Sequence, residues 1–495
     1  MWSRESLQQL IKDRLSDYLL IIVSNRQPYI HSFRKGQVVF QRGAGGVITA
    51  LDPVVRACSG LWVAHGNGDA DPLVTDKKGR VKVPPNNPSY TLKRVFLSKE
   101  EVDGYYYGYA NQAIWPLCHM AFQRPEFYKE HWDTYVEVNK KFAQAVLEEV
   151  KDKKAFVFIQ DYHLALLPKF LKKSGKDQLI VAHFWHIPWP NHETFRICPQ
   201  KREILDGLLY NDLLGFHIRY FCDNFLEAVD REMESRIDRE RYAVIRGEQE
   251  TLVRAFPISV DFEELTRISQ TQEVKMAQKE LTEEYGLNKY KIIIGLDRID
   301  YTKGIPERLL AIDRLLEKYP RFKEKIIFIQ MGEISRIHLF RYKMLNDQIN
   351  ALVEEINWKH SSGKWKPIIM VRRHLDFAEL IAFYKLASVC VVSSLHDGMN
   401  LVAKEFVSSR SDEDGVLVLS QFTGASRELD SALLINPYDR DDFADQLTKA
   451  LTMPKKEREK RMRKLRGVVA RNNIYRWAGK IISELLKLEF KEEGT

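Results

Sequence analysis

Short apolar runs, each bounded by polar or turn residues, recur along the whole chain. Such runs are apolar on both faces, as strands buried inside a parallel sheet are. The pattern therefore predicts buried parallel strands at LLIIVSN (19–25), AFVFIQD (155–161), LIVAHFW (179–185), DLLGFH (212–217), KIIIGLDR (291–298), KIIFIQM (325–331), PIIMVRR (367–373), SVCVVSS (388–394) and GVLVLSQ (415–421).

Helical patterns lie between many of these runs. Apolar residues recur at three and four positions in YVEVNKKFAQAVLEEV (135–150), PERLLAIDRLLEKY (306–319) and FAELIAFYKLA (377–387). Alternating strands and helices predict a doubly wound α/β fold. The pattern restarts after a charged helical stretch at 263–286, which places a domain boundary near 258–265.

The length of 495 residues exceeds what one hydrophobic core usually organises, which favours two domains of roughly 200 to 250 residues. We expect residues 1–260 to form an N-terminal Rossmann-like domain, with a C-terminal helix at about 474–490 packing back on it. Residues 261–473 would form a second Rossmann-like domain that faces the first across a deep cleft. Ligands of open α/β sheets bind beyond the carboxyl ends of strands, so the residues that follow each strand are the candidates.

Composition and charge limit the classes of ligand that the protein is expected to bind. With 44% hydrophobic and 29% charged residues, the chain has the composition of an ordinary folded protein. The formal charge of +8 is spread among acidic residues, so nucleic acid is a poor candidate and anionic metabolites suit it better. The Lys and Arg run in the helical stretch 454–490 is interpreted as a solvated helix face.

The cysteines and the N-terminus indicate a compartment. The cysteines are odd in number, with no CxxC pair and no zinc-finger spacing, which is typical of reduced thiols in a cytosolic protein. Residues 1–17 are polar and amphipathic, and no stretch approaches the length of a membrane span. We therefore expect a soluble cytoplasmic protein without membrane partners. The cysteines are Cys58, Cys118, Cys198, Cys222 and Cys390.

Two cations follow the strand KIIIGLDR. Arg298 and Lys303 lie just before Gly304 and a helix that begins near Pro306, where free amides and the helix dipole favour an anion such as a diphosphate. A surface salt bridge with one of the nearby aspartates is the alternative.

Two carboxylates follow the strand SVCVVSS. Asp397 and Glu405 bracket a turn and the first turns of a helix, which allows one to bind sugar hydroxyls and the other a ribose diol. Capping of this helix by Asp397 is the alternative.

The first half of the chain offers further candidates at strand ends. Arg26 ends VSNR, Asp161 ends FIQD, and His186 follows HFW. The glycines of 43–46 open a helical pattern, although a tight turn needs glycine without any ligand. Each residue alone has a structural explanation, but Asp, His, Arg and Lys at strand ends of both halves together favour a site.

From about residue 19 to 485, the chain resembles the trehalose-6-phosphate synthase family of retaining, GT-B-fold glycosyltransferases. The motifs that carry the resemblance are VSNR, GAGG, NQAIWPLCH, DYHLALLP, HIPWP, DLLGFH, FPISVD, DRIDYTKGIPERL, LHDGMNLVAKEFV, GVLVLSQFTGASREL and NPYDRDDFADQL.

The resemblance implies a donor site for UDP-, GDP- or ADP-glucose, mainly on the second domain. Arg298 and Lys303 would hold the diphosphate, and Glu405 the ribose. Asp397 and His186 would contact the glucose. The remaining donor-binding residues implied are Gly45, Gly46, Gly398, Met399, Asn400 and Leu401.

The resemblance also implies a glucose 6-phosphate pocket, mainly on the first domain, and a mechanism. Catalysis would proceed by front-face internal return, with cations in place of an obligatory metal and with no cofactor. Relatives are often dimers or tetramers, so we expect a homo-oligomer. The implied acceptor residues are Arg26, Tyr106, Trp115, Asp161 and Arg336, and the implied catalytic residues are Asp161, His186, Arg298, Lys303 and Asp397.

Two departures from the family pattern leave alternatives open. His65-Gly66-Asn67 replaces the usual Trp-Ser-Gly near the acceptor pocket, and Val371-Arg372-Arg373-His374 replaces an Asn-Gln segment near the base pocket. The sister activity, glucosylglycerol-phosphate synthesis from ADP-glucose and glycerol 3-phosphate, is the first alternative. A noncatalytic regulatory subunit is the second. A fused phosphatase is not expected, because the DxD at 69–71 is interpreted as a loop.

Overall fold

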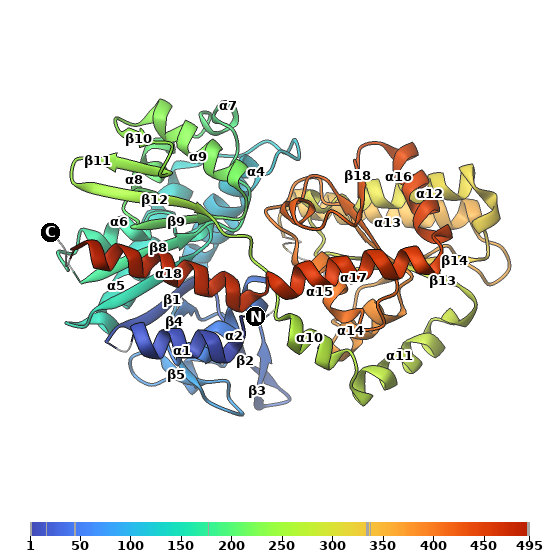
Figure 1. Ribbon diagram of the computed structural model, residues 1–495, viewed down its shortest axis with the longest axis horizontal. Helices are drawn as coiled ribbons and strands as arrows, with labels where there is room; N and C mark the ends of the chain where they lie inside the picture. The colour runs from blue at the N-terminus through green and yellow to red at the C-terminus, as the bar shows by residue number, and fades with distance from the viewer. Residues whose placement is uncertain are drawn as a thin grey trace. The chain divides into compact units, whose positions relative to one another are not determined.

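The computed structural model describes residues 2–15, 17–43, 46–176, 178–332, 336 and 338–492. The chain divides into two compact units (Figure 1). Unit 1 comprises Met1–Ile258 and Ile474–Thr495, and unit 2 comprises Ser259–Asn473. Each unit has a mainly parallel sheet packed against helices, which is the α/β architecture that the sequence predicts.

The sheet of unit 1 has the order β10-β11-β12-β9-β8-β7-β1-β4-β6-β5. Its seven strands from β12 to β6 are parallel, and β10, β11 and β5 add antiparallel edges. A separate hairpin joins β2 to β3. The strands are β1 Leu19–Arg26, β2 Tyr29–Arg34, β3 Gln37–Arg42, β4 Leu61–His65, β5 Arg80–Val83, β6 Tyr90–Val95, β7 Ala155–Gln160, β8 Leu179–Phe184, β9 Leu213–Phe216, β10 Arg236–Asp238, β11 Ala243–Arg246 and β12 Gln249–Ala255.

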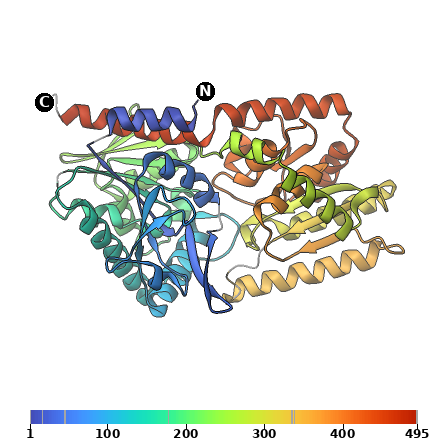
Figure 2. The ribbon, with the colours of Figure 1, turned by 90° about the horizontal axis from the view of Figure 1, so that it is seen from below.

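The helices of unit 1 include both ends of the chain. The first helix and the last lie side by side (Figure 2). A π-helix, η2, spans Val102–Ile114, and short 3-10 helices span Asp71–Val74 (η1) and Tyr162–Leu164 (η3). The α-helices are α1 Arg4–Arg14, α2 Gly46–Cys58, α3 Lys99–Glu101, α4 Trp115–Cys118, α5 Lys129–Val150, α6 Leu167–Lys172, α7 His192–Phe195, α8 Lys201–Leu208, α9 Arg219–Glu232 and α18 Ile474–Glu492.

Unit 2 has a fully parallel sheet with the order β15-β14-β13-β16-β17-β18. Its strands are β13 Lys291–Leu296, β14 Ile326–Met331, β15 Ile368–Val371, β16 Val389–Val392, β17 Val416–Ser420 and β18 Leu433–Ile435. Its helices are α10 Phe262–Ile268, α11 Gln272–Glu284, α12 Ile305–Lys318, α13 Phe340–His360, α14 Phe377–Leu386, α15 Leu401–Ser409, α16 Arg440–Thr452 and α17 Lys455–Arg471, with short 3-10 turns at Leu287–Lys289 (η4), Tyr301–Lys303 (η5), Pro320–Phe322 (η6) and Gly424–Arg427 (η7).

The strand prediction is confirmed at all the apolar runs, and the three helical patterns fall in α5, α12 and α14. Two helical stretches are divided. The helical stretch expected at 454–490 forms α17 and α18, which belong to different units and are separated by Asn472 and Asn473. Asparagine is a poor helix former, and the side-chain amide of Asn472 donates to Glu428 at 3.1 Å, while its backbone amide caps the end of α17 by donating to Val468. The stretch 263–286 likewise forms α10 and α11.

The DxD segment of unit 1 is structural. Asp71, which begins η1 rather than lying in a loop, is fully buried and pairs at 2.9 Å with the equally buried Arg94. Its oxygens also accept from the amides of His31 and Gly68 and from the side chain of Gln27. A carboxylate with this many partners inside the protein holds the fold together and is not available for phosphatase chemistry.

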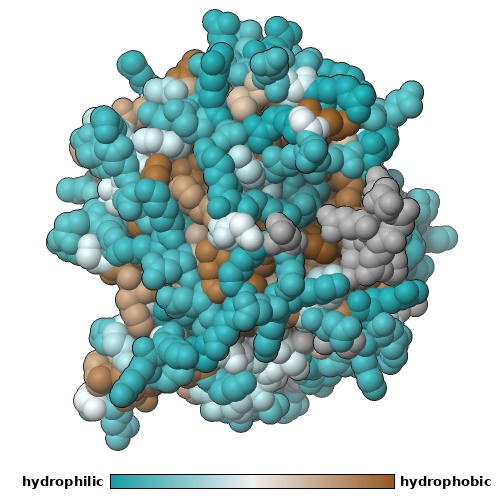
Figure 3. All heavy atoms as spheres, turned by 90° about the vertical axis from the view of Figure 1, so that its left-hand side faces the viewer, coloured by the Kyte–Doolittle hydropathy of each residue, from teal (hydrophilic) through white to brown (hydrophobic). Residues whose placement is uncertain are grey.

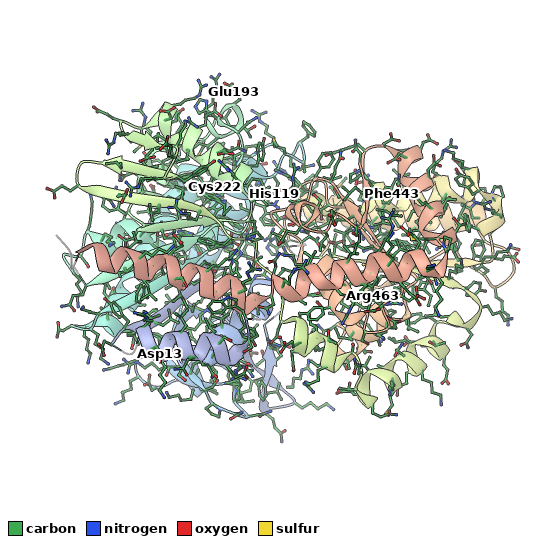
Figure 4. The ribbon with its side chains drawn as sticks, in the orientation of Figure 1. Asp13, His119, Glu193, Cys222, Phe443 and Arg463 are labelled. Atoms are coloured by element: carbon green, nitrogen blue, oxygen red, sulfur yellow. The ribbon has the colours of Figure 1, made fainter. Side chains whose placement is uncertain are left out.

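The surface in view is mainly hydrophilic (Figure 3), and the described thiols are buried. Hydrophilic side chains cover most of the face drawn in Figure 3. In the part of the chain that the structure describes, no helix is long and apolar enough to cross a membrane. Cys118, Cys198, Cys222 and Cys390 are buried free thiols, and Cys222 is labelled in Figure 4. The side chain of Cys58 lies outside the described residues.

Burial keeps His183, in β8, uncharged. Its Nε2 donates to the carbonyl of Asp161 at 2.9 Å, and its Nδ1 has no hydrogen-bond partner among the described residues. Burial lowers the pKa of His183 from 6.5 to about 4, although the bond to Asp161 opposes the shift. The histidine is therefore neutral at physiological pH.

We predict that replacing Arg94 by methionine lowers the free energy of unfolding of unit 1 by about 3 to 5 kcal/mol, because it leaves the Asp71 charge buried without its partner. Urea unfolding followed by tryptophan fluorescence measures this loss. Lys129→Ala is the control, because it breaks an exposed pair with Asp133 and should leave the urea midpoint unchanged. Equal midpoints for all three proteins would contradict the prediction.

We predict that stability falls as the pH is lowered from 7 to 5, and that His183 contributes about 1 to 2 kcal/mol of the fall. Between pH 6.5 and 4 the unfolded chain binds a proton at this histidine and the folded chain does not, so acid favours unfolding. His183→Gln keeps a donor for Asp161 and removes the titration. Urea unfolding at both pH values should show a smaller fall for the variant, and an unchanged fall would refute the assignment.

Candidate functional site

The clearest constellation in unit 2 joins the loops that follow β13 and β16. The Nζ of Lys303 lies 2.6 Å from Oδ2 of Asp397, and both side chains are 14% exposed. The same carboxylate oxygen accepts from Ser394 and Asn400, each at 3.2 Å. Burial lowers the pKa of Lys303, but Asp397 and Asp297 outweigh it, so the net pKa is raised and the lysine keeps its charge.

Local backbone geometry fixes the position of Lys303. The chain leaves β13, makes the 3-10 turn η5, and reverses at Gly304, whose φ is +61°. A Cβ at Gly304 would overlap the carbonyl oxygen of Ser393, so glycine is required here for two reasons. Pro306 then lies in the first turn of α12, where its missing amide hydrogen costs nothing.

The aspartates near the two predicted cations pair with other arginines. Asp297 pairs with Arg308 at 2.6 Å, and Asp300 lies 3.5 Å from Arg336. Burial raises the pKa of Asp300, but the charges of Arg336 and Arg298 outweigh it, so the net pKa is lowered. A surface salt bridge between Lys303 and either aspartate is therefore not what the structure shows; its partner is Asp397.

Asp397 is not the cap of the following helix. The N-cap of α15 is Asn400, whose side chain accepts from the amide of Ala403 at 3.1 Å. Asp397 is instead joined to the neighbouring loop, because its amide donates to Phe422 and its carbonyl accepts from Gly424. Its carboxylate is instead bonded to Lys303, Ser394 and Asn400, so the capping alternative is excluded.

The other residues predicted for the donor lie along the same ridge. Met399 is buried, and its carbonyl accepts from the amide of Ala425 at 2.9 Å. Glu405 lies in α15, one helical turn past the loop, where it accepts from the hydroxyl of Tyr384 at 2.9 Å. Burial raises the pKa of Glu405. Tyr384, which the sequence analysis missed, sits on the apolar side of α14 and gives no sequence signal of its own.

In unit 1 the structure brings Arg26 and Tyr106 together. A guanidinium nitrogen of Arg26, at the end of β1, donates to the Tyr106 hydroxyl at 3.2 Å. The Tyr106 ring stacks on His163, with ring centroids 5.6 Å apart. Tyr106 belongs to the π-helix η2, a rare form that is frequent at functional sites. His163 lies in the DYHLALLP motif, but the sequence did not predict a role for it.

Asp161 and His186 also lie together in unit 1. Asp161 has a φ of +71°, and its Oδ1 accepts from the amides of Tyr162 at 3.0 Å and His186 at 3.3 Å. The His186 ring is bonded to Gln160 at 2.9 Å. Burial, with the neighbouring His217 and His183, lowers the pKa of His186 well below its usual value, so the ring is neutral.

The remaining predicted residues are Trp115, Gly45, Gly46 and Arg336. Trp115 is buried at the start of α4 and packs against His119, labelled in Figure 4, with ring centroids 4.1 Å apart. Gly46 begins α2, but Gly45 lies outside the described residues. Arg336 belongs to unit 2, has a φ of +54°, and donates to the Tyr342 hydroxyl at 2.7 Å.

The two departures from the family pattern have structural partners. Asn67 accepts from Gln27 at 2.8 Å, and burial lowers the pKa of His65 to about 4. Arg372 donates to Asn350 on α13, and Arg373 pairs with Glu379 on α14 at 2.6 Å. These segments are therefore anchored by residues of their own units.

Comparisons with known proteins agree with one another. The model of glycosyltransferase family 20 matches residues 18–487. A trehalose-6-phosphate synthase of Mycolicibacterium smegmatis is 36% identical over 476 residues, which are 94% of this chain and 92% of that protein.

Solved structures give the same result. An E. coli structure bound with UDP-2-fluoro glucose is 31% identical, covers 94% of this chain and 98% of its own, and has a TM-score of 0.83. A UDP-forming α,α-trehalose-phosphate synthase of Burkholderia xenovorans, in complex with glucose 6-phosphate, is 28% identical, covers 94% and 99%, and has a TM-score of 0.84. The chain therefore belongs to glycosyltransferase family 20, as an enzyme of the trehalose-6-phosphate synthase family with the GT-B fold.

Proposed function

We propose that the enzyme transfers a glucosyl group from a nucleotide-glucose to glucose 6-phosphate and releases trehalose 6-phosphate. The observation that carries the proposal is the Lys303–Asp397 pair, which sets a cation for a diphosphate beside a carboxylate for sugar hydroxyls. The E. coli relative binds UDP-2-fluoro glucose, an analogue of a nucleotide-glucose donor, and the Burkholderia relative binds glucose 6-phosphate, the acceptor expected.

We assign the donor chiefly to unit 2. Lys303 and Arg298 hold the diphosphate, and the N-terminal end of α12 adds a favourable dipole. Asp397 and the backbone of 398–401 hold the glucose, and Glu405 binds the ribose. The family resemblance adds Gly45 and Gly46 for the diphosphate, and His186, a neutral ring that can donate or accept, for the glucose.

We assign the acceptor chiefly to unit 1. Arg26 and Tyr106, which are already hydrogen-bonded, bind the sugar phosphate, with Arg336 of unit 2 as a second cation. Trp115 and Asp161 complete the pocket. The buried free cysteines support a cytoplasmic enzyme, and the family precedent suggests a homo-oligomer.

The proposed chemistry is retaining and needs no metal. The bond from the glucose C1 to the leaving diphosphate breaks, and the acceptor oxygen bonds to C1 on the same face. The acceptor proton passes to the leaving phosphate oxygen. Lys303 and Arg298 stabilise the charge that develops on the diphosphate, which is the task a metal ion performs in other transferases.

We predict turnover with glucose 6-phosphate in a product assay that crosses UDP-, GDP- and ADP-glucose with glucose 6-phosphate and glycerol 3-phosphate. EDTA should not change the rate, since two side-chain cations supply the charge. Because His65 and Asn67 depart from the family pattern, glycerol 3-phosphate is the informative alternative. Turnover with it alone would move the enzyme to the sister activity, and loss of activity in EDTA would overturn metal independence.

We predict that Tyr106→Phe raises the KM for glucose 6-phosphate about tenfold and leaves the KM for the nucleotide-glucose unchanged, because it removes the hydroxyl bonded to Arg26. Tyr107→Phe is the matched control on the same π-helix and should behave as wild type. Steady-state kinetics with each substrate varied in turn makes the test. A rise in the donor KM alone would place Tyr106 on the other substrate.

A further inference from the structure

Arg308 is a fully buried arginine at the centre of unit 2. It lies on the first turns of α12 and has no exposed surface. Its guanidinium donates to Asp297, after β13, at 2.6 Å, to Gln330, in β14, at 3.0 Å, and to Ser393, after β16, at 2.9 Å. One side chain therefore ties together the carboxyl ends of three neighbouring strands.

Burying this charge is costly, so the presence of an arginine here needs an explanation. Removing an arginine and a carboxylate from water costs several kcal/mol for each ion, and well-packed apolar residues often replace such pairs without loss of stability. The fold also makes room for the group, because a Cβ at Gly295 would overlap the Arg308 guanidinium. Stability alone is thus a weak reason for this arrangement.

The contacts of Arg308 lead directly to both loops of the donor site. Ser393, which accepts from Arg308, donates its own hydroxyl hydrogen to the carbonyl of Gly304 at 2.8 Å, next to Lys303. The neighbouring Ser394 donates to Oδ2 of Asp397 at 3.2 Å. The loop of Lys303 and the loop of Asp397 are therefore held on one bonded frame with Arg308 at its centre.

We propose that Arg308 is a positioning residue for the donor diphosphate, which acts through Ser393 and Asp297 to hold Lys303 opposite Asp397. The proposal rests on the proposed function, because it assigns the diphosphate to Lys303. This role requires an arginine, because its three guanidinium nitrogens each donate to a different residue. A lysine carries all its donors on one nitrogen and cannot reach all three partners. Arg308 itself does not touch the substrate in this scheme.

The test compares UDP binding, measured by titration calorimetry, in wild type and in the double variant Arg308→Met with Asp297→Asn. The double variant removes the ion pair without leaving an unpaired charge, so we expect it to fold. The Kd for UDP should rise about tenfold or more, while the KM for glucose 6-phosphate stays within about twofold in residual turnover. Arg308→Lys should give an intermediate rise.

The matched control is Arg458→Met with Asp414→Asn. Arg458, on α17, forms a bidentate pair with Asp414 at 2.6 and 3.0 Å in the same unit. Within the described residues, neither side chain is hydrogen-bonded to the loop of Lys303 or the loop of Asp397. This control should leave the Kd for UDP unchanged. It separates the loss of a structural ion pair from the loss of the frame around Lys303.

A folded double variant that binds UDP within about twofold of wild type would overturn the proposal. If the double variant does not fold, Arg308→Lys decides: weakened UDP binding supports the proposal, and wild-type binding overturns it. If the proposed function is wrong, the wild-type enzyme binds UDP but shows no turnover with any acceptor. The comparison of Kd values between wild type and variants still tests the role of Arg308 in that case. Wild type that binds none of UDP, GDP and ADP overturns both.

Discussion

The strands β13 and β16 are neighbours in the sheet of unit 2, and because they run parallel, their following loops leave the sheet at the same edge. That adjacency brings the Lys303 ammonium within 2.6 Å of the Asp397 carboxylate. In this pair each largely buried charge compensates the other. The assignment of the donor, and of Arg308 as the residue that holds the frame, depends on this pairing of strand ends.

Three of the predicted site residues have unusual backbone conformations, although such conformations also occur elsewhere in the chain. Asp161, Arg336 and Asn400 have φ values of +71°, +54° and +80°, a region that side chains rarely adopt, and Gly304 joins them at +61°. Each of the four lies after a strand or before a helix, and each is fixed by bonds to its surroundings. Strain of this kind persists only where the surrounding structure determines it, and such positions cluster at ligand sites. At Asp161, Arg336 and Asn400 the backbone is thus held in place by the surrounding structure.

The sequence predicted the central strands because runs that are apolar on both faces have a clear signal, as in β7 and β16. It missed β2 to β6, β10 to β12 and β18, many of which are short or antiparallel. It did not reveal the π-helix, because residues 102–114 show no helical period. The motifs identify Lys303 and Asp397 as site residues, but only the structure shows that the two side chains form an ion pair. Arg308 was overlooked as an ordinary charge, although it lies on the apolar stripe of its helix, four residues before the buried Ile312.

The most direct test of the central claim is calorimetric titration of Lys303→Gln and Asp397→Asn with UDP and with UDP-glucose. If Lys303 holds the diphosphate and Asp397 the glucose, Lys303→Gln weakens both ligands by about tenfold or more. Asp397→Asn should then bind UDP at least as well as wild type, since the ammonium is released from its partner, and bind UDP-glucose more weakly. Equal loss of UDP binding in both variants, or no loss in either, would contradict the account.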